Sequence, residues 1–186
     1  GIIIADTKFE FGLDENGKNC YVLDINNDLF VMNFGTKVPI VSTYGIDTLI
    51  PDYDYLKNNA KRIKGIFIVD TKNDSLSGLP WLVMEIPNIP IFCSSFSRIS
   101  ILERLSKYNI NLKSIYVEVI PEQGIKVNDT IIHAIPLAGA LPGTIGFSFT
   151  VKEGSYLFLT NFVDGDLGVY GKTDLPAIKS KFPNVL

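Results

Sequence analysis

The chain has 186 residues, of which 46% are apolar, including 12 Phe and 8 Tyr, and its formal net charge is −3. This length and composition predict one globular domain with a large core and exclude a disordered chain. The acidic balance excludes nucleic-acid binding through a basic surface that covers the whole molecule, although a local basic groove is compatible with it.

The cysteine pattern and the hydropathy pattern both bear on the compartment. Cys20 and Cys93 form neither a CxxC pair nor a zinc-knuckle spacing, so we expect two reduced, buried side chains. No apolar run approaches the roughly 18 residues of a membrane span, and no basic segment precedes an apolar one as in a signal peptide. We therefore expect a cytoplasmic protein that does not associate with a membrane.

The first half of the chain predicts short strands with helices between them. Residues 21–25 and 29–32 flank the turn-forming cluster Asn26-Asn27-Asp28 and predict a hairpin. Pro51 and Asp52 precede a predicted helix over residues 53–62, which leads to a fully apolar strand at 66–69. A helix over 79–85 and a strand at 91–93 follow. Ser95 or Ser97 then caps a second helix, whose apolar residues recur every three positions at Ile99, Leu102, Leu105 and Tyr108.

The second half is richer in strands. Strands are predicted over 114–120, 130–135, 144–151 and 155–160, with a hairpin at 152–154 and a helix over 174–181. Residues 185 and 186 predict the start of one more strand. The order of elements favours an α/β (α+β) chain with two sheets packed face to face and helices outside, a four-layer αββα sandwich. We expect one domain over residues 1–186, with the C-terminal end of the fold cut short.

Four segments carry a family resemblance, namely residues 17–22, 45–56, 63–68 and 142–146. On these segments the chain resembles the N-terminal metallo-β-lactamase part of ribonuclease J, in the β-CASP group of RNA-processing nucleases. The match extends over nearly the whole chain, and 45–56 is its most family-specific part. The resemblance implies zinc as the family's metal, and a β-CASP domain inserted after residue 186 in full-length relatives. Much of the RNA channel lies between those two domains, so the resemblance also implies weak RNA binding by this chain.

The same resemblance marks positions where zinc ligands are missing. The family carries a His-x-His-x-Asp-His loop after the strand at 66–69, and here Asp70, Lys72 and Ser75 stand in place of the histidines. Asp74 alone keeps its residue type. The ammonium of Lys72 has no lone pair to donate and repels a dication. Further along, Gly139 replaces a ligand histidine in the ungapped register, Phe162 replaces the metal-bridging aspartate, and Asn33 replaces a carboxylate at a strand end.

Two alternatives could restore a metal site. The sequence His133-Ala134-Ile135-Pro136 matches the family's His-Ser-Ile-Pro motif if residues 137–142 are an insertion, but the ungapped register is simpler and we prefer it. Carboxylates could instead hold Mg²⁺ or Mn²⁺, with Asp70, Asp74, Asp164 and Asp166 as ligands. We favour turn and cap roles for these aspartates, and an ion pair of Lys72 with Asp70 or Asp74 in place of the metal.

Other catalytic arrangements have less support. Ser75 and Ser77 lack a nearby general base, because His133 is the only histidine of the chain. Two functions are left. The first is a non-catalytic ribonuclease J-like subunit, without a bound cofactor, whose partner is an active ribonuclease J paralogue or an RNA-decay assembly and which forms a homo- or hetero-oligomer in the full-length protein. The second is a metal-dependent ribonuclease with a rearranged carboxylate site.

Overall fold

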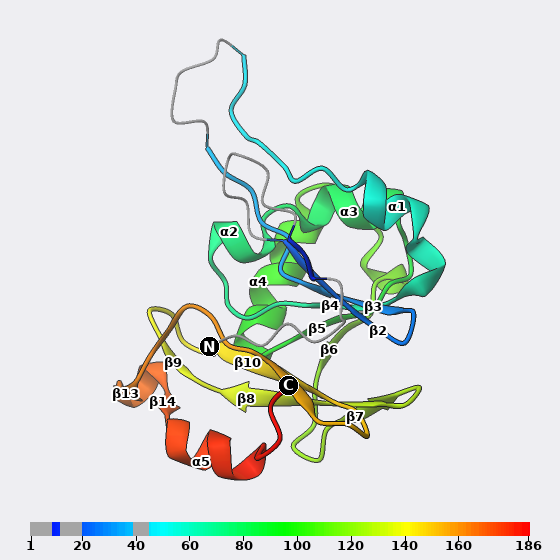
Figure 1. Ribbon diagram of the computed structural model, residues 1–186. Helices are drawn as coiled ribbons and strands as arrows, with labels where there is room; N and C mark the ends of the chain where they lie inside the picture. The colour runs from blue at the N-terminus through cyan, green and yellow to red at the C-terminus, as the bar shows by residue number, and fades with distance from the viewer. Residues whose placement is uncertain (1–8, 12–19, 39–44) are drawn as a thin grey trace.

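We describe the chain through a computed structural model, which covers residues 9–11, 20–38 and 45–186. Two sheets lie face to face, with helices on the outer face of each (Figure 1). In the described residues the first sheet has six strands, ordered β1-β2-β3-β4-β5-β6, of which β3 to β6 run parallel. The strands are β1 (Phe9–Phe11), β2 (Tyr21–Ile25), β3 (Asp28–Met32), β4 (Ile63–Phe67), β5 (Ile91–Cys93) and β6 (Val117–Val119).

The second sheet is antiparallel and lies between the first sheet and the C-terminal helix. Its described strands follow the order β11-β10-β8-β7, with bounds Ser155–Phe158, Ile145–Thr150, Thr130–Pro136 and Ile125–Val127. Two short ladders extend from this layer. One pairs β9 (Ala138–Gly139) with β12 (Phe162–Val163), and the other pairs β13 (Gly165–Asp166) with β14 (Lys172–Thr173).

Helices α1 to α4 lie on the side of the first sheet that faces away from the second, and α5 packs on the second sheet (Figure 1). Their bounds are Asp54–Asn58, Asn73–Leu76, Leu79–Glu85, Ser95–Ser106 and Leu175–Lys181. Short 3-10 turns occupy η1 (Ala60–Arg62), η2 (Leu112–Ser114) and η3 (Gly168–Tyr170). The predicted four-layer αββα architecture is therefore confirmed. No helix in the described ranges has both the length and the apolar character needed to cross a membrane.

Alternating side chains on the first sheet build two separate cores. On β3, Leu29 and Val31 point to the helices, whereas Phe30 and Met32 point to the second sheet. This is the two-residue period of a strand that is buried on both faces. Cys20 and Cys93 are free and buried, and burial raises the pKa of each thiol to about 12.

Phenylalanine rings fill the space between the sheets. The ring of Phe67 lies 5.0 Å from that of Phe92, 5.2 Å from that of Phe147 and 5.1 Å from that of Phe149, measured between centroids. Phe67 comes from the first sheet, and Phe147 and Phe149 come from the second. Phe67 meets Phe147 and Phe149 edge to face, an arrangement that aromatic rings prefer, so the cluster joins the two sheets.

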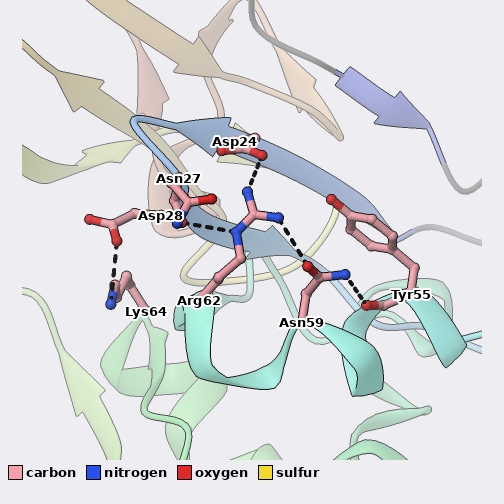
Figure 2. A network of polar contacts seen from close by, with 7 residues as sticks. All are labelled: Asp24, Asn27, Asp28, Tyr55, Asn59, Arg62 and Lys64. Atoms are coloured by element: carbon pink, nitrogen blue, oxygen red, sulfur yellow. Dashed lines mark hydrogen bonds and ion pairs between the residues drawn. The ribbon is translucent and has the colours of Figure 1, made fainter.

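A polar network closes the end of the first sheet where the hairpin β2–β3 turns (Figure 2). The guanidinium of Arg62 donates to the Asp24 carboxylate, to the Asn27 carbonyl at 3.0 Å and to Asn59 Oδ1 at 3.0 Å. Lys64 Nζ lies 3.3 Å from Asp28 Oδ1. The hydrogen bond to Asp24 is the main cause that raises the pKa of Arg62. The network ties the hairpin to the segment that follows α1.

Some predicted elements differ from those observed. Strand β4 begins at 63 and ends at 67, although Ile68 and Val69 stay buried and hydrogen-bonded. The helix predicted over 53–62 divides into α1 and η1, and the strand predicted over 114–120 is confined to β6. The strands β7, β9, β12, β13 and β14 were not predicted, because segments of two or three residues have too little pattern to detect.

Helix α4 shows why a three-residue spacing of apolar residues poorly predicts which side chains of a helix are buried. Its cap is Ser94, whose Oγ accepts from the Ser97 amide at 3.1 Å, rather than Ser95 or Ser97. Its buried residues are Ser97, Ile101 and Leu105, four apart, whereas Ile99 is 69% exposed. A three-residue repeat drifts around a helix of 3.6 residues per turn, so the predicted stripe is wrong at Ile99.

Candidate functional site

Asp70 lies three residues beyond β4 and is only 1% exposed. Its Oδ1 accepts a hydrogen bond from the Lys72 backbone amide at 3.0 Å, and its Oδ2 accepts one from Asn161 Nδ2 at 2.9 Å. A buried carboxylate is costly unless hydrogen bonds compensate it, and here each oxygen has a donor. The Asp70 carboxylate thus joins the first sheet to the segment before β12.

The predicted positions in the second half converge on the same region. Gly139 and Phe162 are register partners in the β9–β12 ladder, and Asn161 directly precedes Phe162. The Ile145 amide donates to the Val69 carbonyl at 2.9 Å, next to Asp70. The structure therefore places the segments of Asp70, Gly139 and Phe162 together at one edge of the two sheets.

Sequence reasoning missed Asn161. Its backbone is left-handed, with φ 58°, a conformation that Asn tolerates better than most residues. This backbone accompanies the side-chain contact with Asp70. One signal in the sequence could have indicated this contact. Asn161 directly precedes the position where the family carries a metal-bridging carboxylate, and its side-chain amide can donate a hydrogen bond to a carboxylate such as Asp70.

The loop after β3 packs against the loop after Asp70. Asn33 is buried, and its Oδ1 accepts from the Val69 amide at 3.2 Å. The Phe34 amide donates to the Ser75 carbonyl at 2.7 Å. A Cβ on Gly35 would lie 1.8 Å from the Asp74 carbonyl oxygen, so only glycine fits there. The side chain at Asn33 thus holds the strand end in place, where the family would have a ligand-orienting carboxylate.

Lys72, Asp74 and Ser75 lie at the start of helix α2. Lys72 is the residue before the helix, with extended φ −65° and ψ 150°, and this directs its amide toward Asp70. The contact that the structure gives between Lys72 and Asp70 is this backbone hydrogen bond, in place of the expected ion pair with Asp70. Asp74 is half-buried in the first turn, and Ser75 is fully buried.

The residues at this edge do not fit a zinc ion. Zinc needs about four donors in tetrahedral geometry, usually imidazoles, thiolates or carboxylates. In the described part of the chain, no group of three or more His, Cys, Asp or Glu side chains could hold a metal. A Cβ at Gly139 would lie 2.2 Å from Thr144 Oγ1, so the packing leaves no room for a ligand side chain there.

The four aspartates of the carboxylate alternative also do not form such a group. Asp164 and Asp166 are exposed. Asp166 Oδ1 accepts from the Gly168 amide at 2.8 Å, which is the turn role that Asp commonly has. Asp166 thus stabilises a turn, as the preferred interpretation expects.

His133 lies on β8, on the face covered by α5. It is the register partner of Ser148 on β10, and its ring centroid is 6.2 Å from that of Phe182, which follows α5. The hydrogen bonds that the structure gives the Asp70 carboxylate come from the Lys72 amide and from Asn161 rather than from His133. His133 therefore belongs to the packing between the second sheet and α5, and Ser75 has no imidazole as a base.

We expect the pKa of His133, the single histidine, to lie below its ordinary value of 6.5. Burial lowers the pKa of His133 first, and the charge of Lys181 lowers it further, while the Gln123 carbonyl opposes both. The folded state thus favours neutral imidazole. Its contribution to stability is present above the unfolded pKa and is lost as the pH falls through the folded pKa.

Proton NMR can follow this titration without assignment, because the chain has one histidine. Lys181→Gln should move the midpoint upward, and Lys179→Gln serves as the control. A wild-type midpoint at or above 6.5 would contradict the placement of His133 beneath α5.

Comparisons with known proteins find similar sequences and similar folds. No protein-family model matches the chain. An uncharacterized protein of Mycoplasma genitalium is 31% identical over 155 residues, which is 82% of this chain and 28% of that protein. Ribonuclease J2 of Bacillus subtilis is 29% identical over 151 residues, which is 81% of this chain and 27% of that protein. The chain thus spans little more than a quarter of the length of these relatives.

Among solved structures, human tRNase Z, short form, superposes with a TM-score of 0.56 at 16% identity, covering 88% of this chain and 67% of that chain. Together with the four layers, this shows that the chain has the metallo-β-lactamase fold. Within that fold, its sequence is similar to ribonuclease J sequences such as that of Bacillus subtilis ribonuclease J2.

Proposed function

We propose that this chain is the N-terminal metallo-β-lactamase part of a longer ribonuclease J-like protein, and that it acts in RNA processing and decay as a non-catalytic subunit. One observation carries the proposal. At the position of the family's first zinc-binding loop, the Asp70 carboxylate bonds to Asn161 and to the Lys72 amide. An amide donor therefore stands where a metal would accept electron pairs.

The packing around this bond supports the same conclusion. Gly139 lies against Thr144 with no room for a side chain, and Ser75 is fully buried. A hydrolase of this fold would need a metal-activated water or a positioned base beside the substrate. The donors at this edge hold the protein's own segments together instead.

A domain that has lost its metal ligands can still bind a partner through its surface. We propose that the partner is an active ribonuclease J paralogue or an RNA-decay assembly, with RNA bound weakly by this part alone. A β-CASP domain in the full-length protein would complete the RNA channel. The free, buried cysteines are consistent with a cytoplasmic protein.

RNA cleavage by the chain tests the proposal against a carboxylate-based nuclease. We expect no cleavage of labelled single-stranded RNA with Mg²⁺, Mn²⁺ or Zn²⁺ beyond that of Asp74→Ala, while Asp129→Ala, at an exposed aspartate outside the four candidate ligands, is the matched control. Metal-dependent cleavage that Asp74→Ala abolishes and Asp129→Ala preserves would refute the non-catalytic role. The proposal also expects that co-expression of the chain with an active ribonuclease J yields a stable complex.

A further inference from the structure

Helix α5 is held on the second sheet mainly by one side chain (Figure 1). Among residues 174–186 only Phe182 is buried, at 5% exposed, whereas every residue of α5 itself is at least partly exposed. A cavity of about 240 Å³ lies between α5 and β8, so close packing is interrupted there. Segments with few buried apolar contacts open first in a folded domain. Within the described ranges, α5 is therefore the α-helix that can detach most easily.

The side chain beneath Phe182 is His133. The centroids of the two rings are 6.2 Å apart, and Lys181 Nζ lies 5.6 Å from the centroid of the same Phe182 ring. Ser148, the register partner of His133 on β10, is fully buried. His133 Nδ1 and Ser148 Oγ are both buried and have no hydrogen-bond partner in the part of the chain that the structure describes. The ring thus lies in a layer of low polarity, where an unpaired charge is costly.

The groups that face His133 disfavour a charged ring. From α5, the ammonium of Lys181 repels an imidazolium. The turn before β7 contributes the backbone carbonyl of Gln123, which accepts from the ring, and Glu122 beside it is exposed. From β10 comes the neutral hydroxyl of Ser148. Among the described residues, none of the groups that shift the pKa of His133 is a carboxylate.

We propose that His133 and Phe182 form a latch, in which proton uptake by the His133 ring releases α5 and residues 182–186 from the second sheet while the core between the two sheets stays folded. Release returns the imidazolium to water and separates it from Lys181, so the charged ring favours the released state.

The segment after α5 is expected to leave together with the helix. Two backbone hydrogen bonds join it to β11, from the Ser155 amide to the Asn184 carbonyl at 2.7 Å and from the Leu186 amide to the Ser155 carbonyl at 2.9 Å. Apart from Phe182, the residues of this segment are at least partly exposed, so little apolar surface opposes its release.

Acid should therefore shift the chain toward the released state. The pKa of His133 lies below 6.5 while α5 is closed, and it returns to about 6.5 once the ring is in water. Above 6.5 the ring is neutral in both states, and α5 stays closed. As the pH falls from 6.5 to the closed-state pKa, the ratio of released to closed molecules rises by up to about tenfold per pH unit, because one proton is taken up.

Hydrogen exchange of the folded 186-residue chain at a series of pH values tests the latch. The Ile178 and Phe182 amides report on α5, because they donate to the Asp174 carbonyl at 2.9 Å and to the Ile178 carbonyl at 3.0 Å. After correction for the intrinsic exchange rate at each pH, their protection should fall below pH 6.5, while the amides of β4 stay protected. Simultaneous loss of protection in α5 and β4, or no loss in α5, would contradict a separate release of α5.

Variants separate the latch from a general sensitivity to acid. His133→Gln cannot become an imidazolium and keeps the Asp174 cap of α5, so the protection of α5 should no longer depend on pH in this range. Lys181→Gln, at an exposed position that should not disturb folding, should weaken the pH response, and Lys179→Gln should leave it unchanged. A full pH response in His133→Gln, or equal responses in the two lysine variants, would overturn the proposal.

Discussion

Replacing Phe67 by alanine should lower the free energy of unfolding by about 3–5 kcal/mol. Phe67 is fully buried, and its ring contacts Phe92 on the first sheet and Phe147 and Phe149 on the second. The substitution leaves a cavity between two sheets that cannot close without moving both. A loss of this size is a large share of the roughly 5–15 kcal/mol that stabilises a typical domain.

Urea unfolding of the wild type and the variant measures this loss. Phe96→Ala is the matched control, because Phe96 is 44% exposed on α4 and should cost about 1 kcal/mol or less. If Phe67→Ala cost no more than Phe96→Ala, the two sheets would not pack through this ring.

Gly139→His should destabilise the chain and should not create a metal site. The family resemblance places a ligand histidine at this position, but a Cβ there would lie 2.2 Å from Thr144 Oγ1 and 2.6 Å from Thr144 Cβ. Thr144 is buried, and its hydroxyl donates to the Leu141 carbonyl at 2.8 Å, so it cannot move without losing that bond. Overpacking of this kind typically costs about 1–3 kcal/mol, and sometimes more.

The control adds the same side chain one residue further on. Ala140 is exposed, so Ala140→His should be close to neutral. Thermal unfolding of each variant with and without Zn²⁺ measures both its stability and any stabilisation by zinc. A Gly139→His variant that is as stable as the wild type and gains stability from zinc would show that the site retains the family's geometry.

The layered fold could be predicted because its signals are local and repeated. The turn residues Asn26 and Asn27 have φ 51° and 70°, the left-handed backbone that a two-residue hairpin turn requires and Asn tolerates. Helix α3 and strand β5 lie at the predicted bounds. In each case neighbouring residues determine the conformation.

The site could be predicted only in part, because it depends on contacts between distant segments. The resemblance identified Asp70, Gly139 and Phe162, and the structure places their segments together. The hydrogen bond between Asp70 and Asn161 joins residues 91 positions apart, and no local sequence pattern predicts it. The same holds for the close approach of Gly35 to Asp74, which depends on how two loops pack.

The metal content of the purified chain tests the central claim, that a hydrogen bond between Asp70 and Asn161 replaces the metal. After dialysis against buffer with Zn²⁺ or Mn²⁺ and removal of free ions, atomic emission should find no stoichiometric metal, and Asp70→Asn should not change the result. One or two ions per chain in the wild type, lost in Asp70→Asn and kept in the exposed Asp129→Asn, would contradict the account.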